Sequence, residues 1–68
     1  MPFGKAYEAM KAGHKVRHKD FKHGGYWRWE DNTIMIHCGD GTVLDIRQTP
    51  FVDYTFSFIA SDAWSIID

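Results

Sequence analysis

The stretch YWRWEDNTIMIHCGDGTVLDIRQ, residues 26–48, decides the fold. Its first segment, YWRWE, alternates so that Trp27 and Trp29 share one face of an extended chain. The segments TIMIHC and TVLDIRQ are also apolar and alternating, with Leu44 expected inward. Short turn formers separate the three segments: Asp31-Asn32 and then GDG. Three strands joined by tight turns predict an antiparallel meander.

A helix is predicted before this meander, over about residues 3–12. Apolar side chains recur there at the i, i+3, i+4 and i+7 positions of one helix face: Phe3, Ala6, Tyr7 and Met10. Gly13 follows at a position where glycine commonly ends a helix. We expect Phe3 and Tyr7 to pack between this helix and the sheet.

The remaining segments complete a compact domain. HKVRHKDF predicts a brief strand, followed by a turn through Gly24-Gly25. Residues 51–61 fit a strand or a helical turn equally well, and AWSIID predicts a short closing strand. The sequence therefore predicts one α+β domain over residues 1–68, with an N-terminal helix packed on a small antiparallel sheet.

The small size of the chain predicts self-association. A domain of 68 residues buries a modest core and usually needs a disulfide, a metal or a partner chain. Cys38 is the only cysteine, so no disulfide can form within the chain. Aromatic residues, which are favoured at interfaces and in pockets, make up 16% of the sequence. We therefore expect a homo-oligomer.

Hydropathy and charge limit the classes of binding partner that we expect for the chain. No apolar run approaches the roughly 20 residues that span a membrane, and the start lacks a signal-peptide layout, so we expect a cytoplasmic protein without a membrane partner. Residues 1–28 hold seven Lys/Arg against two acids, a balance of +5. Residues 29–68 hold one Arg against seven acids, a balance of −6. This acidic half argues against a nucleic-acid binder.

The basic half contains KVRHKDFKHGGYWRW, residues 15–29, which combines five cations with aromatic side chains. Arginine and lysine suit phosphates, while aromatic rings stack on bases, so this pairing serves nucleic acids and small nucleotides alike. An alternative remains open: the aromatics belong to the core and the cations are solvated.

Neither a metal site nor a catalytic site is expected. The possible soft ligands are His14, His18, His23 and Cys38. His14 and His18 are four residues apart, which would align them on a helix, but Gly13 ends the helix before them, and we expect exposed or loop histidines. No nucleophile elbow, paired-carboxylate or zinc-protease pattern occurs. Neighbouring His37 and Cys38 point to opposite faces of a strand, and we expect Cys38 to be a small core residue. The chain is predicted to be non-enzymatic, with no cofactor.

Both ends of the chain resemble one known family. FGKAYEAMKAGHKVRHKDF is similar to an opening that runs Phe-Gly-x-Ala-hydrophobic-x-x-hydrophobic-Lys-x-Gly-x-x-Val-x-Arg, with a Trp shortly after it. IASDAWSIID is similar to a closing Leu-Ala-x-Asp-Trp-x-hydrophobic signature. These motifs resemble the phage and prophage family that includes the second Thoeris anti-defence protein. The resemblance covers nearly the whole chain, with Phe21 in place of the Trp and Ala63 between Asp62 and Trp64.

The resemblance implies a function. Members of that family are small phage proteins that bind a cyclic nucleotide second messenger, of the glycocyclic ADP-ribose or cyclic oligonucleotide type, without cleaving it. Sequestration keeps the messenger from bacterial defence systems such as Thoeris or CBASS. The resemblance also implies a dimer or tetramer with pockets between subunits, in the cytoplasm of the infected bacterial host.

The expected ligand-binding residues combine this resemblance with the basic segment. Phe21 and Trp27 would stack on a base, and Asp62 would accept hydrogen bonds from ribose hydroxyls or a base edge. Trp64 fits a pocket or the core, and Trp29 a subunit interface. The full expected set is Arg17, Lys19, Phe21, Trp27, Asp62 and Trp64, with the two cations on phosphates.

Two rival functions remain. Exposed aromatics could form a patch that binds and inhibits a host protein. A small nucleic-acid binder would instead show a steep fall of affinity with salt.

Overall fold

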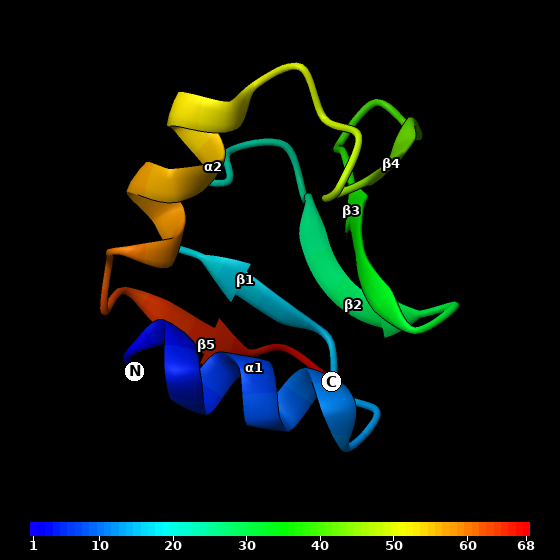
Figure 1. Ribbon diagram of the computed structural model, residues 1–68. Coiled ribbons are helices and arrows are strands. Elements are labelled where there is room, and N and C mark those ends of the chain that lie inside the picture. Colours follow the sequence, from blue (N-terminus) through cyan, green and yellow to red (C-terminus); the bar gives the residue numbers. More distant parts are fainter.

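The computed structural model describes residues 1–68 and has two helices and five strands (Figure 1). In chain order the elements are α1 (Phe3–Lys11), β1 (Val16–His18), β2 (Tyr26–Glu30), β3 (Thr33–His37), β4 (Val43–Asp45), α2 (Val52–Ile59) and β5 (Trp64–Ile66). The predicted α+β class, the N-terminal helix and the closing strand are confirmed.

The strands form one antiparallel sheet in the order β4-β3-β2-β1-β5. The first four strands are consecutive neighbours, so the predicted meander is confirmed and extends to β1. The closing strand β5 returns to the free side of β1, where Arg17 pairs with Ser65. The C-terminal segment thus completes the sheet beside the first strand.

The turn between β2 and β3 sets the register of the meander. Asp31 and Asn32 have φ angles of 52° and 61°, the left-handed values that a tight primed hairpin turn requires. Aspartate and asparagine tolerate this conformation better than most residues. Glu30 therefore pairs directly with Thr33, and Trp27 pairs with Ile36 three rungs of the ladder further along.

Both helices lie on the same face of the sheet. The ring of Trp27, in the middle of β2, lies 5.9 Å from the ring of Phe3 in α1 and 6.5 Å from that of Phe58 in α2. In Figure 1, α1 runs along β5 while α2 lies beyond the other side of β1. The opposite face, which carries Tyr26 and His37, is not covered by a helix.

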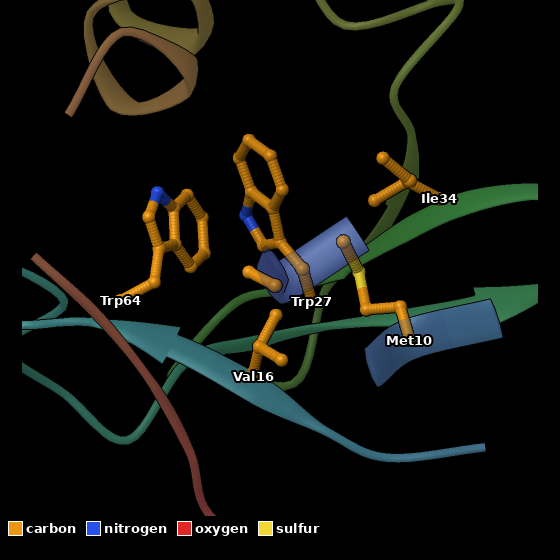
Figure 2. Packing of buried hydrophobic residues seen from close by; sticks show 6 residues of the cluster. Met10, Val16, Trp27, Ile34 and Trp64 are labelled. Carbon is orange, nitrogen blue, oxygen red and sulfur yellow. The ribbon is translucent and has the colours of Figure 1, made fainter. Parts of the chain in front are cut away.

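The core lies between α1 and the strands β1, β2 and β5. Figure 2 shows Trp27 and Trp64 side by side above Val16, with Met10 reaching in from α1; the two tryptophan centroids are 4.8 Å apart. The buried apolar set is Ala6, Met10, Val16, Trp27, Ile34 and Trp64. Phe3 and Tyr7 pack against it, as expected from the helical stripe.

One segment differs from the sequence expectation, and another takes one of the two forms that the sequence left open. The strand TVLDIRQ is shorter than expected, because the chain turns at Asp45, whose carboxylate accepts the N–H of Arg47 (2.8 Å) and whose carbonyl accepts the N–H of Gln48 (2.9 Å). Within residues 51–61, Val52–Ile59 form the helix α2, which is the helical one of the two expected alternatives. Thr55, on the inner side of this helix, is its only buried residue.

Candidate functional site

A cavity of about 360 Å³ lies between α2, the meander and the loop that joins β1 to β2. Its volume is within the range of small-ligand sites. Five aromatic rings line it, together with the aliphatic side chains of Ile36 and Leu44; the rings are those of Phe21, Trp27, Phe51, Tyr54 and Phe58. The lining contains one lysine but no arginine, aspartate or glutamate. The cavity is thus an aromatic-walled pocket of low charge.

Phe21 and Trp27 meet in one wall of the cavity. Trp27 is held in β2 with its ring toward the helices, and Phe21 reaches it from the β1–β2 loop, where the Phe21 N–H bonds the carbonyl of His18 (3.0 Å). The two ring centroids are 5.9 Å apart, and Phe58 of α2 lies edge-on to Phe21 at 4.9 Å. Such tilted and edge-on pairs are favourable arrangements of aromatic rings.

Helix α2 forms the opposite wall through one turn of its inner side. Thr55 is buried there, and its hydroxyl donates to the carbonyl of Phe51 at 2.9 Å, so no buried polar atom is left unsatisfied. Tyr54 packs on Phe58 at 5.3 Å but is 67% exposed. The ring of Tyr54 therefore stands at the mouth of the cavity rather than inside the core.

The β1–β2 loop is fastened to the sheet by Arg17. Its guanidinium donates to the carbonyl of Gly25 through Nε (2.7 Å) and to the carbonyl of Gly24 through a terminal nitrogen (2.9 Å). These bonds fix the end of the loop that carries Phe21. Arg17 was expected to bind phosphate; in this structure its Nε and one terminal nitrogen are engaged with backbone oxygens.

Gly39 lets the loop close on the turn between β3 and β4. A β-carbon at Gly39 would overlap the carbonyl and the β-carbon of His23, so only glycine allows this approach. His23, Gly39 and the adjoining Lys22 all border the cavity. The two glycine-containing turns, which carry no phosphate-loop pattern, therefore act together as one rim.

Cys38 borders the cavity between this rim and β3. The thiol is partly buried rather than a core residue, which corrects the sequence expectation. Burial, and next the negative charge of Asp40, raise the pKa of the Cys38 thiol above its ordinary value. The thiol therefore stays protonated at neutral pH and is a weak nucleophile.

His18 is buried, at 3% exposure, which corrects the expectation for this histidine, whereas His14 and His23 are exposed as expected. Its Nδ1 accepts the N–H of Asp20 (3.1 Å), and its Nε2 lies 2.7 Å from the hydroxyl oxygen of Ser61. Because Nδ1 is an acceptor in the neutral ring, Nε2 carries the proton and donates it to Ser61. In this tautomer His18 cannot take the hydroxyl proton, so the pair is not arranged for nucleophilic catalysis.

Three other expected site residues lie outside the cavity lining. Lys19 and Asp62 are exposed in the loops beside the α2–β5 connection, where the N–H of Lys19 bonds the carbonyl of Ala63 (3.0 Å). Trp64 is in the core, and its indole N–H donates to the carbonyl of Phe58 at 2.9 Å. The structure thus brings together Phe21 and Trp27 from the expected set, with Trp64 next to both rings (5.5 and 4.8 Å). Trp27 is only 2% exposed and belongs to the core, so little of its ring is left to stack on a ligand.

The residues that sequence reasoning missed are mainly those of α2 and the rim. Phe51, Tyr54 and Phe58 were visible as aromatics, but the helix-or-strand ambiguity hid which of them share a face. Lys22 and His23 belong to the quoted basic segment and could have been found from their place next to Phe21.

Comparison with known proteins adds no relative: no family model, no curated protein and no solved structure matches the chain. Neither helix is long and apolar enough to cross a membrane.

Proposed function

We propose that the protein is a phage anti-defence sponge that binds a cyclic nucleotide second messenger and holds it without cleaving it. The messenger is of the glycocyclic ADP-ribose or cyclic oligonucleotide type. The protein acts as a homo-oligomer in the cytoplasm of the infected bacterium. The observation that carries this proposal is the aromatic cavity whose rim belongs to the cation-rich β1–β2 loop.

The cavity suits a flat ring. Phe21, one of the two residues expected to stack on a base, lies in one wall beside the buried ring of Trp27, and Tyr54 stands across the mouth. Stacking between a base and an aromatic side chain contributes about 1–3 kcal/mol per base. Lys22 and His23 at the rim supply donors for phosphate oxygens.

Binding without turnover is supported by the chemistry of the polar groups. The one histidine–serine pair is held in the tautomer that donates to Ser61, and Cys38 is kept as the thiol. Neither group is therefore prepared to attack a phosphate or a glycosidic bond.

Self-association is supported by the exposed apolar side chains of α2 and of the residue that precedes it. Phe51, Val52, Tyr54 and Phe56 are each about half exposed or more, and Phe56 reaches 62%. Aromatic residues of this kind are enriched at interfaces, where they exclude water. Strand pairing at the β5 edge of the sheet is less favourable, because Met1 already bonds both backbone groups of Trp64 there (2.7 and 3.2 Å). A second copy packed on α2 would also cover the cavity mouth.

The sponge activity is tested by recovery of the bound compound. The protein is incubated with each of a panel of cyclic nucleotides and cyclic ADP-ribose isomers, freed of unbound ligand by gel filtration, and then heat-denatured. Mass spectrometry of the released material should find one compound intact and stoichiometric. If every compound that binds were released as a cleaved product, the protein would be an enzyme and not a sponge.

The exposed α2 face also supports a second candidate function, inhibition of a host protein through an aromatic patch. Val52 and Phe56 do not line the main cavity, so they could contact a protein independently of any ligand. A pull-down from host lysate separates the two functions. A stoichiometric protein partner that is lost with Phe56→Ala favours inhibition, whereas a heat-releasable small molecule favours the sponge.

A further inference from the structure

The cavity and its rim differ in chemical character, and this difference constrains how a nucleotide can sit. Among the lining residues the only fixed charge is that of Lys22, which is exposed in the β1–β2 loop. The other lining side chains are mostly aromatic or aliphatic, and the polar ones are two histidines, two threonines and Cys38. A phosphate drawn into this interior would lose its hydration without gaining a paired charge.

The polar side chains of the interior are already engaged. The hydroxyl of Thr55 donates to the carbonyl of Phe51, and the hydroxyl oxygen of Thr49 accepts the N–H of the same residue (3.2 Å). These bonds close the first turn of α2. They occupy the hydroxyl hydrogen of Thr55, and the hydroxyl hydrogen of Thr49 is a single neutral donor, which does not offset the desolvation of a phosphate.

His37 supplies no charge to the interior either. Its partner across the ladder is Tyr26, and the two rings stack on the uncovered face of the sheet at 4.5 Å. There Nε2 of His37 bonds the carboxylate of Glu30 at 2.9 Å. His37 borders the cavity, but its imidazole is held against Tyr26 and Glu30 on the face of the strand opposite to that of Ile36.

We infer that the cavity takes only the uncharged flat ring of its ligand, and that the anionic groups stay outside on the cationic rim of the β1–β2 loop. Lys22 and His23 border the mouth, and Lys19 lies in the same loop. This inference rests on the proposed function and specifies the orientation of the ligand in the same site. The stacked ring sets the basic affinity, and the phosphate adds a smaller, salt-sensitive increment.

The test compares nucleosides with their phosphates. Adenosine, guanosine, cytidine and uridine, their 5′-monophosphates and inorganic phosphate are each titrated at low and high salt. Binding in the cavity is followed through protection of Cys38, which lines it, from alkylation. At least one nucleoside should protect Cys38 equally at both salt concentrations. Its monophosphate should bind more tightly at low salt only, and inorganic phosphate should give no protection.

Two charge variants locate the anion. Lys22→Gln should weaken binding of the monophosphate by roughly twofold to fivefold, as for an exposed ion pair, and leave binding of the nucleoside unchanged. Lys5→Gln removes the same charge from the exposed side of α1 and should change neither. Protection by inorganic phosphate, or an equal effect of both variants, would overturn the inference.

The experiments distinguish failure of this inference from failure of the proposed function. If a cyclic nucleotide binds but no nucleoside protects Cys38 or competes with it, the orientation is wrong and the sponge stands. If no member of the cyclic nucleotide panel binds, the proposed function fails and the orientation fails with it.

Discussion

The imidazole of His18 and the hydroxyl of Ser61, 43 positions apart in the chain, are joined by a hydrogen bond of 2.7 Å between Nε2 and Oγ. This bond ties β1 to the segment that leads from α2 into β5. The ring of His18 also lies 4.9 Å from that of Phe58, which lines the cavity. The stability of the fold and the shape of the cavity wall therefore depend on the same pair.

Ser61→Ala should lower the free energy of unfolding by about 1–3 kcal/mol, because the buried Nε2–H of His18 loses its acceptor. Asp62→Ala, at the exposed neighbouring position, should change it by less than about 0.5 kcal/mol. Urea denaturation followed by tryptophan fluorescence measures both. Equal stability of the Ser61 variant and the parent would contradict the assigned bond.

Gly39→Ala should destabilise the protein, because a β-carbon at this position meets the backbone of His23 and forces the β1–β2 loop outward. Gly4→Ala is the matched control: its β-carbon would meet nothing within 4 Å, and it lies in α1. There alanine should stabilise the helix by up to about 1 kcal/mol. Thermal unfolding of the two variants should shift in opposite directions; a shift in the same direction would argue against a closed rim.

Alkylation of Cys38 should require a more alkaline pH than alkylation of a free cysteine, because burial and Asp40 raise the pKa of the thiol. Asp40→Asn removes the second cause and should lower that pKa, so the reaction becomes faster at neutral pH. The raised pKa also means that the thiol favours the folded state below its ordinary pKa, and that this contribution is lost as the pH rises through the folded value. A rate profile that matches free cysteine would show that the thiol is not shielded.

Asp45→Asn should reduce stability at neutral pH and lose that effect in acid. Hydrogen bonds from Arg47, and then the charge of that guanidinium, lower the pKa of Asp45 to about 2. A lowered pKa gives stability that is present above the ordinary aspartate pKa and disappears as the pH falls through about 2. The difference between parent and variant in urea denaturation should therefore shrink between about pH 4 and pH 2. A difference that is constant with pH would rule out the ion pair as its source.

Local patterns predicted the elements whose neighbours are close in sequence. Alternation in residues 26–48 and the left-handed pair Asp31-Asn32 specify the meander, because each strand pairs with the next one along the chain. The stripe from Phe3 to Met10 specifies α1 in the same way.

Patterns that depend on distant partners were not predictable. The burial of His18 follows from its bond to Ser61, which no local signal connects to it. The helix α2 buries Thr55 and exposes Phe56, the reverse of an ordinary amphipathic helix, so periodicity could not distinguish it from a strand. The cavity could not be predicted either, because α2 forms one of its walls.

The most direct test of the central claim is titration calorimetry of the protein and its Tyr54 variants against the cyclic nucleotide panel, with light scattering in the same buffer. Tyr54 is suited to this test because it borders the cavity yet is 67% exposed, so its removal spares the core. One compound should bind the parent and Tyr54→Phe with sub-micromolar affinity and a multi-subunit mass. Tyr54→Ala should weaken it by roughly tenfold through loss of stacking. No heat from any compound, or equal binding by Tyr54→Ala, would contradict a sponge that works through this cavity.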